Sequence, residues 1–195
     1  MKKLSLLGAF LVLALLSFSF AKKPRVKSSM RTISKSLTFP VAGMKSNIGS
    51  YWGARRDGGK RKHQGIDIFA RRGTAVVAIC DGVITLKDHT PIGGKTLWLD
   101  SEDHSWTAYY AHLDKQYVKE GQFVRKGQVI GTVGNTGNAR TTPSHLHFGI
   151  YTNRGPVNPL PYVKYSPKVS APKIAKKKKV SIVKTKNLKK VNRRR

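Results

Sequence analysis

The chain has 195 residues, a length typical of one domain with flanking segments. Its 38 lysines and arginines outnumber 9 acidic residues, which gives a formal net charge of +29, and 39% of the residues are hydrophobic, enough for one core. The single cysteine excludes an internal disulfide framework and a cysteine-rich zinc cluster.

The positive charge is concentrated at the two ends of the chain. Residues 1–37 and 164–195 contain many lysines and arginines and no acidic residue, whereas all 9 acids lie between them. This distribution predicts a moderately basic globular domain over residues 38–163 with two strongly basic flanks, and the function is to be sought in that domain.

The first residues have the pattern of an export signal. Lys2 and Lys3 precede an uncharged apolar run from Leu4 to Phe20, and Ser19 and Ala21 are small residues at the positions that a signal peptidase reads. We therefore expect residues 1–21 to be a cleaved signal peptide, which implies a periplasmic, envelope-bound or secreted protein. An uncleaved anchor and a buried helix are the alternatives. Residues 22–37 are expected to form a basic linker.

Residues 164–195 form a Lys/Arg-rich tail, with four lysines at 176–179 and three arginines at the end. Such runs repel themselves and stay disordered unless an anionic partner neutralises them. Because an exported chain meets little nucleic acid, we expect no specific nucleic-acid partner. Anionic polymers of the cell envelope or a membrane surface are the better candidates, and a solvated tail without a target is the alternative.

The middle of the chain consists of short apolar runs separated by turn residues, a pattern typical of strands. The expected strands cover residues 73–79, 83–86, 96–99, 106–111, 129–134 and 146–151. No sustained helical period occurs outside the N-terminal run. The predicted fold class is all-β, an antiparallel β-sandwich or partly open barrel. Two Gly-Gln turns six residues apart, at 121 and 127, predict a compact β-turn-β element like half of a biotin-carrier barrel.

Two pairs of residues indicate a metal site. His145 and His147 are two apart on an expected strand, so both imidazoles face one side while Leu146 faces the other. His63 precedes an expected strand on which Asp67 points away from the apolar residues beside it, and a carboxylate in such a setting needs a partner. Hydrogen-bonded core histidines and an edge carboxylate are the alternative interpretations.

The other histidines have different surroundings. His112 ends an apolar run and is either a core residue or a functional one, whereas His89 and His104 lie in polar stretches that predict exposed loops. Two histidines and one carboxylate with an open fourth position is the ligand set of catalytic zinc, and further histidines can supply proton transfer.

At these residues the sequence resembles the lysostaphin/LytM-type zinc endopeptidases, which cut stem peptides or cross-links of bacterial peptidoglycan. The resemblance covers roughly residues 40–163. It includes an H-x-x-x-D motif at 63–67, an H-x-H motif at 145–147, the stretch Tyr110–Leu113, the glycine-rich run 131–137 and Pro156–Pro159. It implies a LytM-type fold and one Zn²⁺ per chain, held by His63, Asp67 and His147. His112 and His145 would be catalytic, with base and stabiliser unassigned.

The resemblance also implies peptidoglycan as substrate, and we expect a monomer. The basic segment at 55–62, just before His63, is expected to shape the substrate groove and to favour an acidic stem peptide, although a solvated loop is possible. Some relatives lack the zinc residues and activate amidases instead. A non-catalytic peptidoglycan-binding or amidase-activating module, and a polyanion-binding protein that acts through its tail, are therefore the competing hypotheses.

Overall fold

The computed structural model describes residues 37–171. The predicted signal peptide, the predicted linker up to residue 36 and the tail beyond residue 171 lie outside the described residues. Within residues 37–171, no helix is long and apolar enough to cross a membrane.

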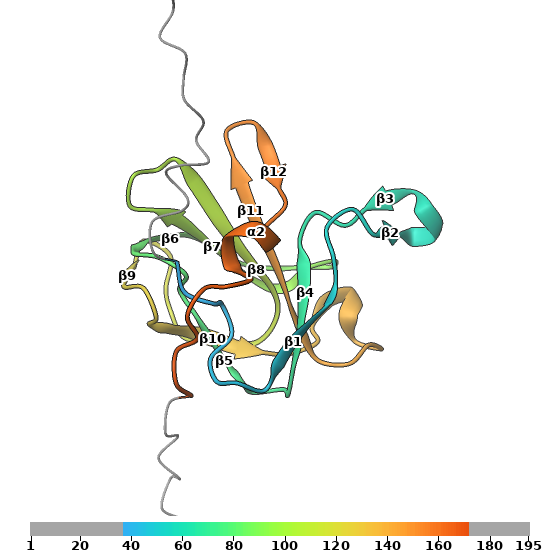
Figure 1. Cartoon of the computed structure of the whole chain (residues 1–195), viewed down its shortest axis with the longest axis horizontal. Coiled ribbons are helices and arrows are strands. Elements are labelled where there is room, and N and C mark those ends of the chain that lie inside the picture. Colours follow the sequence, from blue (N-terminus) through green and yellow to red (C-terminus); the bar gives the residue numbers. More distant parts are fainter. Residues whose placement is uncertain (1–36, 172–195) are drawn as a thin grey trace, which may run out of the picture.

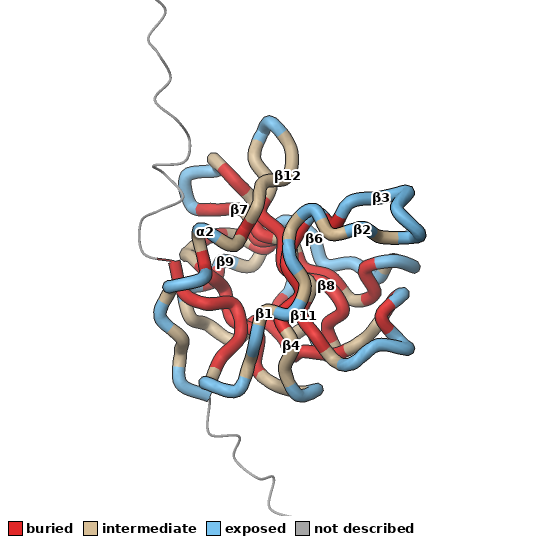
Figure 2. The backbone as a smooth tube through the Cα atoms, turned by 45° about the vertical axis from the view of Figure 1, so that its right-hand side comes forward, coloured by how far each residue is buried: buried red, intermediate tan, exposed pale blue. Residues whose placement is uncertain are grey.

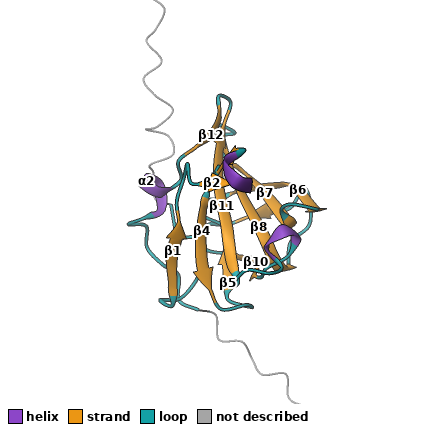
Figure 3. Ribbon diagram, turned by 90° about the vertical axis from the view of Figure 1, so that its right-hand side faces the viewer, coloured by secondary structure: helices purple, strands orange, loops and turns teal. Residues whose placement is uncertain are grey.

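The described part of the chain is almost entirely β-structure, as predicted (Figures 1 and 3). In chain order the elements are β1 (Ser46–Ser50), β2 (Arg55–Arg56), the 3₁₀ turn η1 (Asp57–Gly59), β3 (Arg61–Lys62), β4 (Ile66–Ala70), β5 (Ala75–Val77), β6 (Gly82–Thr90), β7 (Gly94–Ser101), β8 (Trp106–Gln116), β9 (Phe123–Val124), β10 (Val129–Val133), η2 (Gly137–Ala139), β11 (His145–Thr152), β12 (Gly155–Val157) and the short helix α2 (Leu160–Val163).

Ten of these strands form one antiparallel sheet. Seven follow the order β1-β4-β11-β8-β7-β6-β9, β5 and β10 join off this path, and β12 pairs with β11. β2 pairs with β3 in a separate hairpin. The sheet branches at β8, because its first half pairs with β11 and its second half, from Leu113 to Gln116, pairs with β10. β10 continues to β5, and Val76 of β5 bridges to Val41. This branch turns the sheet around one core.

The core is built from alternating residues of the central strands. Leu146, Phe148 and Ile150 of β11 and Ile66 and Ile68 of β4 have no exposed surface, whereas the residues between them face the opposite side of the sheet. Period-two alternation of this kind is what a strand with one buried face requires. Figure 2 shows the buried backbone in red at the centre and the β2–β3 hairpin exposed at the edge.

The repeated Gly-Gln element forms two similar turns. Gly121 and Gly127 have φ of 77° and 81°, and the side-chain Oε1 of Gln122 and of Gln128 each accepts a backbone N–H three residues earlier. The strands that follow are not partners of each other, because β9 pairs with β6 and β10 pairs with β5 and β8. The element is therefore a double turn that feeds two parts of the sheet.

Residues 164–171, which the sequence analysis assigned to the tail, lie against the segment before and within β1. The carbonyl of Pro167 accepts the backbone N–H of Phe39, and the carbonyl of Val169 accepts that of Gly43. Lys168 Nζ lies 3.1 Å from Ser46 Oγ and 4.7 Å from the ring centroid of Phe39. These contacts tie the last described residues to the first ones.

Candidate metal centre

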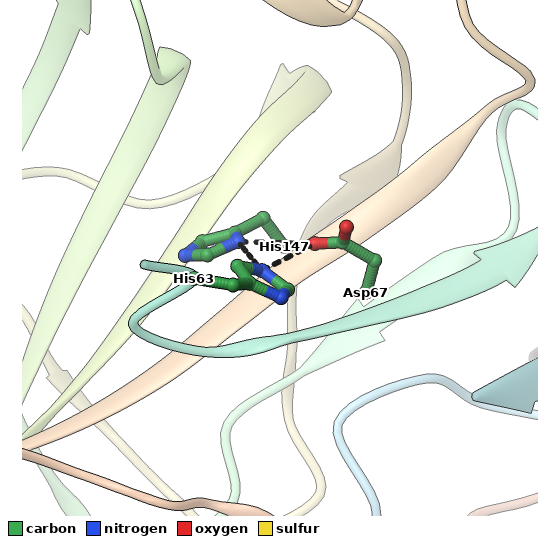
Figure 4. A group of neighbouring side chains, drawn as sticks. All are labelled: His63, Asp67 and His147. Carbon is green, nitrogen blue, oxygen red and sulfur yellow. Dashed lines mark hydrogen bonds and ion pairs between the residues drawn. The ribbon is translucent and has the colours of Figure 1, made fainter. Parts of the chain in front are cut away.

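Three side chains from two neighbouring strands and a loop converge on one point (Figure 4). Asp67 of β4 and His147 of β11 are direct register partners, so their side chains leave the sheet on the same face. His63 lies in the loop between β3 and β4. His63 Nε2 is 2.9 Å from His147 Nδ1 and 3.0 Å from Asp67 Oδ1, and His147 Nδ1 is 3.0 Å from the same oxygen.

A backbone carbonyl fixes the orientation of His63. Its Nδ1 lies 2.9 Å from the carbonyl oxygen of Tyr51, which can only accept, so Nδ1 carries the proton and donates it. Nε2 is therefore the ring atom that faces Asp67 Oδ1 and His147 Nδ1. A histidine held in one tautomer by an outer partner is the usual arrangement of a metal-ligating imidazole.

Asp67 is divided between two sets of partners. Burial opposes its ionisation, but the hydrogen bonds to His147 and His63 outweigh burial and hold the pKa of Asp67 well below its usual range. Its second oxygen, Oδ2, forms an ion pair of 2.5 Å with Nη2 of Arg56, which also donates to Ser50 Oγ at 2.9 Å. Asp67 is thus an ionised, oriented carboxylate with Oδ1 directed at the two imidazoles.

The donor set fits a zinc ion. Two imidazole nitrogens and one carboxylate oxygen, all within 4.8 Å of one another, match the ligand types of catalytic zinc, and the site is largely buried. Burial lowers the pKa of His147, which favours the neutral ring that a metal requires.

Gly65 allows the His147 ring to lie where it does. A Cβ at Gly65 would stand 2.7 Å from Cε1 of His147 and 2.6 Å from the carbonyl oxygen of Phe148. The carbonyl oxygen cannot move without shifting β11, and the His147 ring cannot move without changing its contacts with His63 and Asp67. The glycine between His63 and Asp67 therefore serves close packing rather than an unusual backbone angle.

His112 and His145 lie beside the three candidate ligands. The His112 and His145 ring centroids are 4.9 Å apart, and that of His112 is 6.0 Å from that of His147. His112 Nδ1 is 2.9 Å from the Thr136 carbonyl and His145 Nδ1 is 2.9 Å from the Pro143 carbonyl, so both rings donate from Nδ1 and keep Nε2 free.

The backbone at His112 departs from regular strand geometry. Its φ is +61°, and the register shifts beside it in both the β7–β8 and the β10–β8 pairings. As a result Ala111 and His112, which a regular strand would place on opposite faces, both line the same pocket. Burial and the neighbouring histidines lower the pKa of His112 to about 4, so the ring is neutral at pH 7.

The loop that supplies the Thr136 carbonyl is itself fixed. Thr136 Oγ1 donates to the Leu113 carbonyl and accepts the backbone N–H of Lys95. Next to it, Gly94 and Gly137 both have positive φ and approach so closely that a Cβ on Gly137 would lie 2.3 Å from the nitrogen of Gly94. The orientation of His112 therefore depends on a packed contact between two glycines.

The five residues line a pocket of about 660 Å³ with three sides. The sheet wall comprises Asp67, Tyr109, His112, His145 and His147, on β4, β8 and β11. The hairpin wall comprises Arg56, Asp57, Arg61 and Lys62, and a third side is formed by uncharged residues of the loop that includes Asn138 and Pro143. Tyr109 also stacks with Trp98 at 4.5 Å and lies 5.9 Å from His147, and burial raises its pKa to about 12.

The structure thus brings together all five residues singled out from the sequence. It keeps His89 and His104 away from the pocket. Both are exposed, as expected, although His89 lies near the end of β6 rather than in a loop and His104 Nδ1 contacts Asp100. Sequence reasoning missed Arg56 as the partner of Asp67, because nothing distinguishes it among the five cations of residues 55–62. It also missed the carbonyls that orient the histidines.

Solved structures of known proteins share this architecture. The catalytic domain of lysostaphin from Staphylococcus simulans superimposes with a TM-score of 0.55 at 34% identity, over 60% of this chain and 92% of that domain. A zinc-containing peptidase from Vibrio cholerae gives a TM-score of 0.57 at 30% identity, over 64% of this chain and 39% of the other.

Relatives with curated names differ in what they do. The L-Ala–D-Glu endopeptidase of Bacillus subtilis is 40% identical over 114 residues, which cover 54% of this chain and 35% of the relative. The murein hydrolase activator NlpD of Salmonella dublin is 37% identical over 112 residues, which cover 57% of this chain and 28% of the relative. The match spans about a third or less of these relatives' own length.

The sequence model of peptidase family M23 matches residues 61–159, about half of the chain. That region holds His63, Asp67, His112, His145 and His147. The chain therefore belongs to peptidase family M23.

Proposed function

We propose that this protein is an exported zinc metalloendopeptidase that hydrolyses peptide bonds of bacterial peptidoglycan, within a stem peptide or a cross-link. The observation that carries the proposal is the convergence of His63 Nε2, Asp67 Oδ1 and His147 Nδ1 beside two histidines whose Nε2 atoms are free. One zinc ion per chain is proposed, with His63, Asp67 and His147 as its ligands.

A zinc ion held by these three residues lowers the pKa of a bound water to about 7 and polarises a peptide carbonyl. The protein's own residues supply the remaining chemistry. The ring of His112 or His145 accepts a proton at Nε2 and gives it to the leaving amine. The other ring takes a separate proton from solvent at Nε2, and it then donates a hydrogen bond from that nitrogen to the developing oxyanion.

The positions of both histidines are fixed before substrate arrives. Each ring is held by a backbone carbonyl and is at most 8% exposed, so neither needs to reorganise. Their assignment as base and stabiliser is left open, because both present the same nitrogen to the pocket.

The competing role is a binding or amidase-activating module of the same fold, which the similarity to NlpD favours. The presence of all five side chains in a working arrangement favours the hydrolase. For the whole protein we further propose export through residues 1–21, a monomeric state, and attachment of the basic tail to anionic envelope polymers or a membrane surface.

The test is mass spectrometry of fragments released from purified walls of several types by wild type, His145→Ala and the exposed-histidine control His89→Ala. Wild type and His89→Ala should release peptides with new amino termini, and a chelator should stop the release until zinc is added back. If zinc-loaded wild type releases nothing from any wall, the activating role replaces the hydrolase.

A further inference from the structure

The hairpin β2–β3 carries an excess of positive charge at the mouth of the pocket. Residues 55–62 contain five lysines and arginines and one acid, Asp57. Arg56 and Arg61 are register partners, so their side chains lie on the same face of the hairpin, and Lys62 directly precedes His63. Arg56, Arg61 and Lys62 all line the pocket. These three cations line the same pocket as the candidate ligands and the uncharged residues Asn138 and Pro143.

The cations on this wall differ in whether a carboxylate pairs with them. Arg56 is committed to Asp67, and Arg61 Nε pairs with Asp57 Oδ2 at 2.5 Å. In the part of the chain that the structure describes, Asp57 and Asp67 are the only acidic residues that line the pocket. Within residues 37–171, no carboxylate lies within ion-pair distance of Lys62. An anionic group that enters the pocket therefore meets one free cation, one exposed arginine and no unpaired carboxylate.

We infer that Lys62 and Arg61 bind a carboxylate of the peptide substrate and so select acidic over amidated peptides. This inference rests on the proposed function, because it names the class of peptide that the same pocket accepts. The carboxylate is either an acidic side chain or the free end of a peptide, since both present the same two oxygens to an arginine or lysine.

Asp57 competes with the substrate for Arg61. It sits at the hairpin tip with φ of +51°, a conformation that asparagine also tolerates, so Asp57→Asn removes the competing charge at little steric cost. The hydrogen bond from Arg61 keeps the pKa of Asp57 below its usual range, so the side chain is charged at neutral pH. If Asp57 and Arg61 only stabilised the turn, the same substitution would weaken binding or leave it unchanged.

The experiment measures peptide binding by NMR titration of the full chain freed of metal with a chelator, so that a zinc charge does not contribute. Three forms of one acidic wall stem peptide are compared: both carboxylates free, the side-chain carboxylate amidated, and the terminal carboxylate amidated. Wild type should bind the free acid about three- to tenfold more tightly than one of the amides, as expected for one or two exposed ion pairs. The amide that loses affinity identifies the source of the carboxylate.

Variants locate the effect on the hairpin wall. Lys62→Gln with Arg61→Gln should reduce the preference below about twofold, and Asp57→Asn should tighten binding of the acid. The control combines Lys60→Gln at the hairpin tip with Lys119→Gln before β9, which removes the same two charges at positions that do not line the pocket, and each single variant is compared as well. The combined and the single control variants should all keep the preference.

Three results would overturn the inference: equal binding of acid and amides by wild type, an effect of Lys60→Gln as large as that of Lys62→Gln with Arg61→Gln, or weaker acid binding by Asp57→Asn. Cleavage by the zinc-loaded protein separates this inference from the proposed function. Equal cleavage of acid and amides would support the proposed hydrolase and contradict the selectivity. Selective binding without cleavage of any peptide would support the selectivity and contradict the hydrolase.

Discussion

The sheet wall and the hairpin wall of the pocket are built in opposite ways. On the sheet wall, His112 and His145 are 8% and 5% exposed, and their rings are held by backbone carbonyls, whereas the side chains of Arg61 and Asp57 on the hairpin are about half exposed and bind only each other. Buried groups with fixed partners are suited to proton transfer, and exposed charges are suited to attracting a substrate. The comparison indicates that chemistry and selection are assigned to different parts of the fold.

Arg56 connects the two walls. It belongs to the hairpin, yet its side chain is 34% exposed and its guanidinium reaches the Asp67 carboxylate on the sheet. The hairpin is therefore anchored at the metal centre rather than attached only through its loops.

The largest expected effect separates the walls by catalysis. His112→Ala and His145→Ala should each lower kcat by 10²–10⁴, the usual contribution of a positioned acid or base, while zinc content stays at one per chain. Steady-state kinetics with metal analysis measures both. Lys62→Gln on the hairpin wall should change KM rather than kcat, and a loss of kcat in that variant comparable to the histidine losses would contradict the division of roles.

The second effect is a dependence of stability on pH that arises on the sheet wall. His112 binds a proton near pH 6.5 when unfolded but only near pH 4 when folded, so its contribution is complete above pH 6.5 and is lost as pH falls toward 4. The loss is about 3 kcal/mol. Asp67 does not contribute to this loss. Its pKa is depressed in the folded state, so its stabilisation is complete down to about pH 4 and is lost only below that pH.

Urea unfolding of the metal-free protein at pH 7.5 and pH 4.5 measures this loss. His112→Gln should show a smaller difference between the two pH values, with a remainder from His147, whose pKa burial also lowers, whereas Lys62→Gln should behave as wild type. An unchanged pH dependence in His112→Gln would show that another group is responsible.

Much of this division can be predicted from sequence, because core-facing and pocket-facing residues alternate along the central strands. Leu146 between His145 and His147 is fully buried, as the period of two requires. In the strand after Gly65, Asp67 lies on the other face from Ile66 and Ile68 for the same reason. The all-β antiparallel fold is confirmed for the same reason.

Other features left no pattern to read. β6 extends through residues 85–89, which are all exposed. Because apolar and polar residues do not alternate there, the sequence predicts a loop at His89 rather than a strand. β8 continues past His112, where a positive φ changes the direction of the side chain. No residue type at that position indicates such a change. The strands of the hairpin have two residues each, too short for any period.

The third prediction concerns the connection between the walls. Arg56→Gln removes the cation from Asp67 Oδ2 and should weaken zinc binding about 10- to 100-fold, as loss of an outer partner of a metal ligand usually does. Competition with a chelating dye measures the affinity. The adjacent Arg55→Gln, which does not line the pocket, is the matched control and should bind zinc as wild type does. Equal zinc affinities in the two variants would show that Arg56 does not support the metal centre.

The smallest effect tests packing under the sheet wall. Gly65→Ala places a methyl group 2.7 Å from the His147 ring and should cost about 1–3 kcal/mol of stability, with weaker zinc binding. Gly149→Ala is the control, since its nearest contact is the ring edge of Tyr151 at 3.0 Å, which can move. Thermal unfolding with and without zinc compares the two, and equal costs would mean that the His147 ring is free to shift.

The central claim is that His63, Asp67 and His147 hold one metal ion, and zinc stoichiometry tests it most directly. Full-length wild type and the control His89→Ala, dialysed against limiting free zinc, should each retain one zinc ion per chain, and His147→Ala should retain almost none and lose activity. One zinc ion per chain in His147→Ala, or hydrolysis at the wild-type rate by that variant, would contradict the account.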